Sequence, residues 1–202
     1  MSITHTLSGL AQFVTIAGKA GQKIELVHVV SPERVDLLGP ITGRHSQRTL
    51  LARAEFKPGI GSSFSFGKFH DPETFIIALL ALFEDTGHRP AVLQLVGTMK
   101  NEQVRTSEDN GYFQNVKAKS GVVLVKDVEI PNPVTLSPRR TFQEIAQPSS
   151  PFLLRVRNVD SDEPPHAALF EADGGTWRVA AVNAIADFLR HAEMPTDIPI
   201  IA

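Results

Sequence analysis

The sequence predicts an α+β fold with mainly antiparallel sheets and about three helices. Short segments with alternating apolar residues dominate the chain, and turn residues join several of them directly, which favours antiparallel strands. Helical patterns occur in three places and do not alternate with the strands as they would in a doubly wound sheet. Because there is no repeat and no clear linker, we expect one domain, 1–202, that ends in a loose tail at 194–202.

The first part of the chain predicts one helix followed by three strands. Apolar residues recur at i, i+3 and i+7 in THTLSGLAQFVTIAG, which predicts a helix that ends at Gly18 or Gly21. Strands are predicted in KIELVHVV, RVDLLG and QRTLLARAEF, the first two joined by a turn around Pro32. The glycine- and serine-rich loop KPGIGSSFSFGKF follows. We expect its phenylalanines to pack into the core rather than to form a flap over a ligand.

The clearest helix is predicted in DPETFIIALLALFEDTG. Asp71 is suited to the N-cap, Pro72 to the first helical position, and Gly87 to the C-terminal stop. The middle of this helix has no polar residue on any face, so it must be covered on several sides. We expect a second copy of the chain to cover one side, which predicts a homo-oligomer.

The rest of the chain is predicted to be rich in strands. They are expected in PAVLQLVGTM, in the hairpin EQVRTSEDNGYFQNVKAK with an Asn110-Gly111 turn, and in GVVLVKDVEI. FLLRVRN predicts a half-exposed strand with Arg155 and Arg157 on its outer face. HAALFEADGGTW predicts a strand and a tight turn, and VAAVNAIADFLRHA predicts the last helix.

Composition and charge exclude several classes of protein. The chain has no cysteine, which excludes disulfides, thiol catalysis and cysteine-based zinc sites. A net charge of -2 gives no overall basic field for non-specific DNA binding. The N-terminus lacks the pattern of a secretory signal, and the longest apolar run, 75–83, is too short to span a bilayer. We expect a cytoplasmic protein that does not contact membranes.

No motif for catalysis or for a cofactor is found, so we expect a protein that is not an enzyme and binds no cofactor. The glycines of GIGSSFSFG do not have the spacing of a dinucleotide or phosphate loop, and no histidine lies at metal-binding spacing. Glu171 and Asp173 share a strand face, an arrangement that can hold magnesium. Beside a Gly-Gly turn they are expected to stabilise the turn instead, and metal binding stays open.

Arginines are the candidate ligand-binding residues. In LSPRRTFQEIAQPSSPF, prolines restrict the backbone around Arg139 and Arg140, so that these side chains are positioned before a ligand arrives. The guanidinium group is suited to phosphate and carboxylate, and it stacks on aromatic rings. The alternative is a set of solvated surface charges. The predicted anion-binding set includes two further arginine pairs and one aromatic residue: Arg44, Arg48, Arg139, Arg140, Arg155, Arg157 and Phe142.

Four stretches carry a resemblance to a known family: VHVVSPERVDLLGPITG, FSFGKFHDPETFIIALLALF, VEIPNPVTLSPRRTFQEIAQPSSPFLLRVR and ALFEADGGTWRVAAVNAI. The chain resembles uncharacterised proteins encoded by temperate phages and prophages, mainly of Gram-positive bacteria. The resemblance covers roughly residues 26–190 and implies a phage origin and action inside the host cell. It transfers no catalytic residue. The family commonly has an aromatic residue in the dipeptide that is Arg139-Arg140 here.

Four functions follow from these observations. The favoured one is a non-enzymatic phage protein that antagonises a host defence system, by binding a protein complex or by sequestering a nucleotide signal. A virion structural protein and a magnesium-dependent enzyme that uses Glu171 and Asp173 are two further alternatives. The remaining alternative is a single-stranded nucleic-acid-binding accessory protein of phage replication or recombination. Its aromatic residues would include Phe64, Phe66, Phe69, Tyr112, Phe113 and Phe142.

Overall fold

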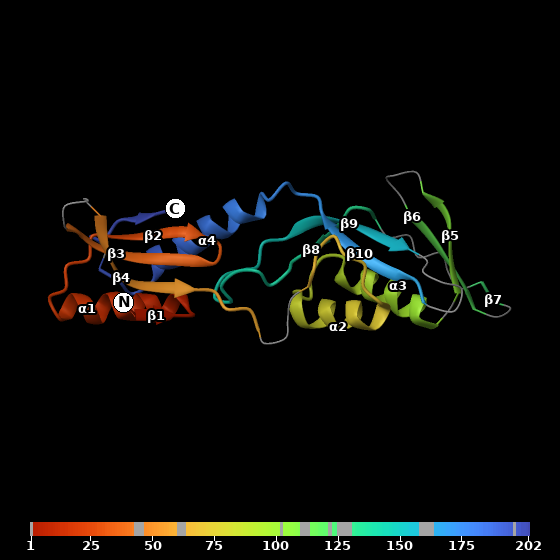
Figure 1. The fold of residues 1–202 in the computed structure, drawn as a ribbon, viewed down its shortest axis with the longest axis horizontal. Coiled ribbons are helices and arrows are strands. Elements are labelled where there is room, and N and C mark those ends of the chain that lie inside the picture. The colour runs from red at the N-terminus through yellow and green to blue at the C-terminus, as the bar shows by residue number, and fades with distance from the viewer. Residues whose placement is uncertain are drawn as a thin grey trace. The chain divides into compact units, whose positions relative to one another are not determined.

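A computed structural model gives the fold of the chain (Figure 1). It describes residues 2–42, 47–59, 64–101, 103–109, 114–120, 123–124, 131–157, 164–195 and 197–202, and for residues 100–124 it describes the backbone alone. Contacts divide the chain into two compact units. Unit 1 comprises 1–59, 139–148 and 176–202, and unit 2 comprises 60–138 and 149–175. Neither unit is continuous in sequence, and the number of independently folding domains stays a prediction.

Unit 1 is a five-stranded mixed sheet with two helices on one face. The strand order is β1-β4-β3-β2-β11, in which the central strands pair antiparallel and both edge strands pair parallel to their neighbours. The elements are β1 (Ser2–Thr4), α1 (Leu7–Lys19), β2 (Leu26–Ser31), β3 (Arg34–Thr42), β4 (Gln47–Glu55), α4 (Trp177–His191) and β11 (Ile200–Ile201).

The core of unit 1 lies between the sheet and its helices. Val27 of β2 is opposite Leu37 of β3, and Leu37 is opposite Ala52 of β4. All three are buried, and they belong to one apolar cluster with residues of both helices, so α1 and α4 cover the same face. The predicted helical faces are confirmed, since Leu10 of α1 and Ile185 of α4 are fully buried in this cluster.

The ends of α1 follow from local sequence. The Thr6 side chain accepts a hydrogen bond from the Gly9 N–H and caps the helix. Gly21 has a φ of 74°, and its N–H donates to the Gly18 carbonyl at 3.0 Å. Gly21, one of the two predicted positions, therefore ends the helix, whereas Gly18 lies inside it.

The prediction of a loose tail at 194–202 is wrong. Ile200 and Ile201 pair with β2, and the Pro199 carbonyl accepts a hydrogen bond from the Val27 N–H at 2.9 Å. Met194 and Ile200 also pack against the core of unit 1. The open edge of β2 supplies a hydrogen-bonding partner that local sequence does not reveal.

Unit 2 contains two antiparallel three-stranded sheets and two helices. The strand orders are β10-β9-β8 and β5-β6-β7. The elements are α2 (Pro72–Leu82), α3 (Arg89–Asn101), β5 (Gln103–Asp109), β6 (Gln114–Ser120), β7 (Val123–Leu124), β8 (Val134–Leu136), β9 (Ser150–Arg157) and β10 (His166–Glu171). The α+β prediction is confirmed. The predicted hairpin is β5–β6, and its Asn110-Gly111 turn lies outside the described residues.

The prediction of a strand in PAVLQLVGTM is wrong, because this segment forms most of α3. Its buried residues are Val92, Leu95, Val96 and Met99, which recur at i, i+3, i+4 and i+7. They pack in one apolar cluster with Leu79 of α2. The part of the chain that the structure describes thus has four helices rather than about three.

Helix α2 begins as predicted and ends earlier. The Asp71 side chain accepts a hydrogen bond from the Thr74 N–H at 3.0 Å. The helix ends at Leu82 rather than near Gly87, because Phe83 is extended and 1% exposed and makes a β-bridge with the segment after β8. A tertiary contact therefore ends α2 before the local stop signal.

One face of α2 is covered within unit 2 and the other is not. Phe75 and Leu79 are fully buried, whereas Ile77 is 59% and Leu80 is 53% exposed. The prediction that the helix is covered on several sides holds for one face alone. Coverage by a second copy of the chain stays a prediction. No helix among the described residues has the length and apolar character needed to cross a membrane.

Two of the three phenylalanines of the glycine-serine loop pack against the core as predicted, whereas Phe69 does not, because its ring lies against Arg157 and Phe170 instead. Phe66 stacks on Phe152 with ring centroids 5.2 Å apart, and Phe64 contacts Phe75 edge to face at 5.5 Å. Both loop residues belong to the periphery of the unit 2 core. Phe64 and Phe66 were two of the candidates for stacking on the bases of a nucleic acid, and their rings pack against other phenylalanines of the chain instead.

Candidate functional site

The proline-bracketed segment forms a strap, residues 139–148, that holds unit 1 together. Phe142 is 1% exposed in the core, and the Thr141 hydroxyl donates to the Pro32 carbonyl at 2.5 Å. The Glu144 carboxylate accepts hydrogen bonds from the first two N–H groups of α1, at 2.9 and 2.8 Å. The prediction that Phe142 contacts a ligand is therefore corrected, because its ring is enclosed by the core.

Arginines gather around one tryptophan at the start of α4. The Arg140 guanidinium carbon lies 3.9 Å from the Trp177 ring centroid, and that of Arg178 lies 4.9 Å from it. Trp177 is 6% exposed, while the neighbouring Arg139 is exposed. Two cations on one indole are an arrangement that sequence alone did not reveal, since Arg140 and Trp177 belong to distant segments.

Arg48 is engaged within unit 1. Its Nη1 donates to the Glu25 carboxylate at 2.5 Å and lies 3.4 Å from the Gly39 carbonyl oxygen. Hydrogen bonds from Lys23 and Arg48 hold the pKa of Glu25 below its usual value. Arg48 thus has a protein carboxylate as its partner. Arg44 lies outside the described residues.

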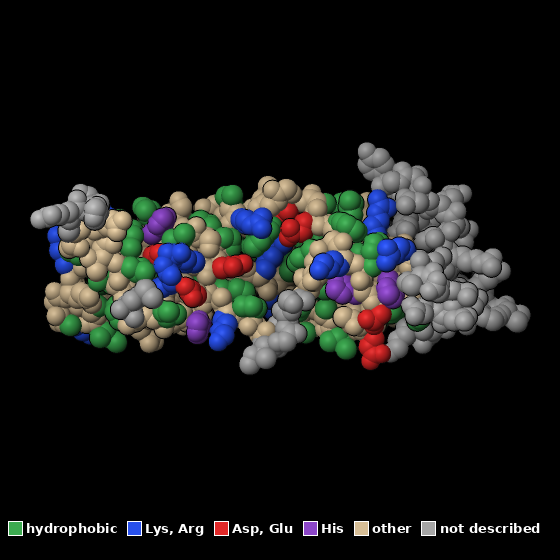
Figure 2. All heavy atoms as spheres, viewed as in Figure 1, with side chains coloured by type: hydrophobic (Ala, Val, Ile, Leu, Met, Phe, Trp, Pro, Cys, Tyr) green, Lys and Arg blue, Asp and Glu red, His purple; other side chains and the backbone are tan. Residues whose placement is uncertain are grey.

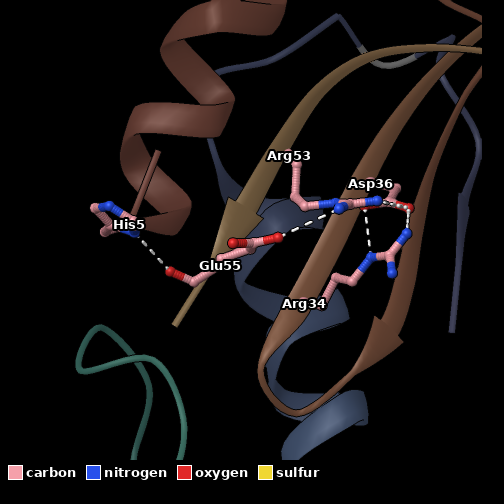
Figure 3. Close-up of polar contacts among 5 residues, drawn as sticks. All are labelled: His5, Arg34, Asp36, Arg53 and Glu55. Atoms are coloured by element: carbon pink, nitrogen blue, oxygen red, sulfur yellow. Dashed lines mark hydrogen bonds and ion pairs between the residues drawn. The ribbon is translucent and has the colours of Figure 1, made fainter. Parts of the chain in front are cut away.

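The sheet face of unit 1 that points away from α1 and α4 carries a charged cluster on β3 and β4 (Figure 3). Asp36 is 6% exposed and accepts hydrogen bonds from the Nε of Arg34 at 3.0 Å and the Nε of Arg53 at 2.7 Å. Arg53 Nη1 also lies 3.3 Å from the Glu55 carboxylate. Asp36 and Arg53 are direct cross-strand partners, so this cluster fixes β3 against β4.

Asp36 serves as an anion that orders two cations. Burial favours its protonated form, but hydrogen bonds from Arg34 and Arg53 outweigh burial and lower its pKa. The carboxyl group therefore stays ionised near neutral pH. Such a group positions guanidinium groups and does not donate a proton.

A second cluster, which we call the arginine face, lies on the outer side of β9 and β10 in unit 2. Phe152, Leu154 and Val156 of β9 point into the core, which leaves Arg155 and Arg157 on the outer side as predicted. The arginine face consists of these two arginines and three neighbouring residues, Phe69, His166 and Phe170.

An arginine, two aromatic rings and a histidine lie next to one another on the arginine face. The Arg157 guanidinium carbon lies 4.4 Å from the Phe69 ring centroid, and Phe69 meets Phe170 edge to face at 6.3 Å. His166 is the cross-strand partner of Arg157. Figure 2 shows blue Lys and Arg side chains and purple His side chains close together over the region where Figure 1 draws β9 and β10.

Asp173 stabilises a turn, as predicted. Its carboxylate accepts hydrogen bonds from the Ser150 hydroxyl at 2.7 Å and from the Gly175 N–H at 2.8 Å. Glu171 is the exposed last residue of β10. Within the described ranges, no three His, Asp or Glu side chains are grouped as metal ligands.

The predicted arginines thus fall into separate places rather than one site. Arg139 and Arg140 lie in unit 1, where Arg140 stacks on Trp177, and Arg155 and Arg157 lie on the arginine face of unit 2. The arginine face is the better candidate site, because exposed cations, half-buried rings and a histidine lie on one sheet surface. Comparisons with protein-family models, curated proteins and solved structures find no match to this chain.

Proposed function

We propose that this chain is a non-enzymatic binding protein, of phage origin and active in the host cell, whose ligand is a nucleotide. Sequestration of a nucleotide signal would antagonise a host defence system. The observation that carries the proposal is the Arg157 guanidinium on the Phe69 ring, with His166 opposite it on the same sheet surface.

The chemistry of this pair suits a phosphate ester that bears a base. A guanidinium group stacked on a ring keeps its N–H groups at the edge, where they can donate to phosphate oxygens. The contact with Phe170 supports the Phe69 ring from the side. The base of the nucleotide would stack on the exposed parts of the Phe69 and Phe170 rings, while the phosphates of the nucleotide contact the arginines.

The local charge differs in sign from the net charge of the chain. Residues 64–70, β9 and β10 contain Lys68, Arg155 and Arg157 but a single carboxylate, that of Glu171. Residues 158–163, between β9 and β10, are acidic in sequence and lie outside the described residues. Electrostatic attraction toward a phosphate therefore depends on the arginine face itself and will weaken with salt.

A single-stranded nucleic acid is the second candidate ligand. Arg155 and Arg157 are two residues apart on β9, which places their Cα atoms about 6.7 Å apart. Two cations at this spacing can contact different phosphates of one strand, with Phe69 available to a base.

Fluorescence anisotropy with two labelled probes tests the proposal. One probe is a labelled adenosine triphosphate, and the other is an oligodeoxythymidine of about 15 nucleotides. We expect the nucleotide to bind at low salt, and Arg157→Ala to weaken binding about tenfold because the stacked cation is lost.

Arg190→Ala is the matched control, because Arg190 is an exposed arginine on α4 that pairs with Asp187. It should leave binding unchanged. Tighter, strongly salt-dependent binding of the oligonucleotide would favour the second candidate. Failure of both probes to bind at low salt, or equal losses in both variants, would exclude a ligand site on the arginine face.

A further inference from the structure

A groove of about 650 Å³ lies between α1 and α4 of unit 1. Its volume is within the range of pockets that hold ligands or side chains of a partner. Helix α1 lines it with residues spaced i, i+3, i+4, i+7 and i+8, which form one continuous strip of the helix surface. These residues are Ser8, Ala11, Gln12, Thr15 and Ile16.

Helix α4 and the residue pair after it form the other wall. Phe188 and Ala192 add apolar surface, and His191 and Glu193 add polar groups. Ile16, on the facing wall, is 67% exposed although it is aliphatic. Two helices that present such strips side by side leave a surface of the shape that a third helix fills by ridge-into-groove packing.

One hydrogen bond joins the two walls of the groove, and another orients a side chain of α4. The Thr15 hydroxyl lies 3.1 Å from the Glu193 carbonyl oxygen, which ties the segment after α4 to α1. The His191 Nδ1 lies 2.7 Å from the Asp187 carbonyl oxygen. A carbonyl only accepts, so Nδ1 carries the proton and Nε2 is left for a partner. Walls that are joined in this way lose less entropy when the groove is filled.

The charge of the groove indicates which kind of helix can bind in it. No Lys or Arg is among the residues that line it, whereas Glu193 contributes a carboxylate. The exposed apolar strip of α2 on a second copy is a poor match, because the charged residues next to it in sequence, Asp71, Glu73, Glu84 and Asp85, are all acidic. A helix with Lys or Arg beside its apolar face is complementary.

We infer that the groove between α1 and α4 docks an amphipathic helix of a partner protein, one that carries aliphatic side chains on one face and basic residues beside them. The mode is the laying of a helix into an apolar groove, with anchors at i, i+3 and i+4. It is independent of the arginine face, which lies in unit 2.

The test uses the full chain and two synthetic peptides of about 18 residues, long enough to form helix on binding. One has leucines at i, i+3, i+4 and i+7 with lysines elsewhere, and the other has glutamates in place of the lysines. We expect the leucine-lysine peptide to bind at least tenfold more tightly in fluorescence anisotropy. Ile16→Asp should weaken it about tenfold, because an exposed apolar anchor becomes a charge.

Two further variants separate the groove from general apolar or electrostatic attraction. Val179→Asp is the matched control, because Val179 is 64% exposed on α4 and does not line the groove. It should leave binding within about twofold of the unchanged protein. Glu193→Lys should reduce the preference for the leucine-lysine peptide. Equal losses in Ile16→Asp and Val179→Asp, an unchanged preference in Glu193→Lys, or no binding of either peptide would overturn the inference.

Discussion

Asp36 is the residue on which the charged cluster of β3 and β4 depends. It is nearly buried, and both Arg34 and Arg53 direct two N–H groups at its two oxygens. Removing one partner of such a cluster leaves charges without compensation, which costs more than a surface ion pair contributes. Because Arg34 stays partly exposed, solvent screens part of that cost.

We predict that Asp36→Asn lowers the free energy of unfolding by about 2 kcal/mol at pH 7. The pKa of Asp36 is lowered in the folded state, so the unfolded chain binds this proton first as the pH falls. Its contribution is complete above the unfolded value near 3.8 and disappears as the pH falls through the lower folded value. Urea unfolding at several pH values from 7 to 3 should show a shallower loss of stability in the variant.

The Asp36→Asn variant should still lose some of its free energy of unfolding at acidic pH, because the pKa values of Glu25 and Asp71 are also lowered in the folded chain. The control is Glu33→Gln, at an exposed residue of the β2–β3 turn, which should follow the unchanged protein. Parallel acid profiles for Asp36→Asn and the unchanged protein would contradict the role given to Asp36.

At the scale of elements, α1 depends on a residue far away in sequence. Its own N-cap, Thr6, satisfies one N–H group, and the Glu144 carboxylate satisfies those of Leu7 and Ser8. A carboxylate at this position also interacts with the positive end of the helix dipole. The strap and α1 therefore stabilise one another.

We predict that Glu144→Gln lowers the free energy of unfolding by about 1 kcal/mol and that Glu144→Ala lowers it by about 2 kcal/mol. The amide keeps one acceptor but loses the charge, whereas alanine removes both acceptors. Urea unfolding monitored by circular dichroism measures the difference. Gln143→Ala, at the exposed neighbour in the strap, should change stability little. Equal stability of Glu144→Ala and Gln143→Ala would contradict the capping role.

The elements also show which parts of the fold can be predicted. The C-terminal stop of α1 at Gly21, the N-cap of α2 at Asp71 and the strands β2, β3, β4, β9 and β10 follow from local patterns, and the structure confirms them. The segment around Val92 and Val96 is compatible with both a strand and a helix, and its helical spacing is decided by packing on α2. Local sequence cannot show the early end of α2 or the pairing of β11, because both depend on distant partners.

The candidate site was predictable in part for the same reason. Alternation along β9 placed Arg155 and Arg157 on one surface, as the structure shows. The partners of these arginines come from other elements, namely Phe69 and His166. Prolines around Arg139 and Arg140 indicated a fixed segment, but a ligand was not needed to explain it, since Phe142 and Glu144 hold the strap in unit 1.

At the scale of the whole molecule, each unit is assembled from separated segments. The chain passes between the units four times, at 59–60, 138–139, 148–149 and 175–176. The core of unit 1 combines β2, β3 and β4 with Phe142 of the strap and with Ile185 and Leu189 of α4. The N-terminal segment therefore contains most of the sheet but only part of the apolar surface that the sheet requires.

We predict that a fragment of residues 1–59 does not fold by itself. It contains β1–β4 and α1 but lacks α4, β11 and the strap, so one face of its sheet would expose the side chains that Ile185 and Leu189 cover. A chain of this length has little core to lose and is marginal even when complete. Far-UV circular dichroism with thermal unfolding measures the outcome, with the full chain as control. We expect no cooperative transition in the fragment and none when a peptide of residues 176–202 is added, because Phe142 and Glu144 are still missing. A cooperative transition in the fragment alone would show that the later segments attach to a domain that is already formed, rather than complete its core.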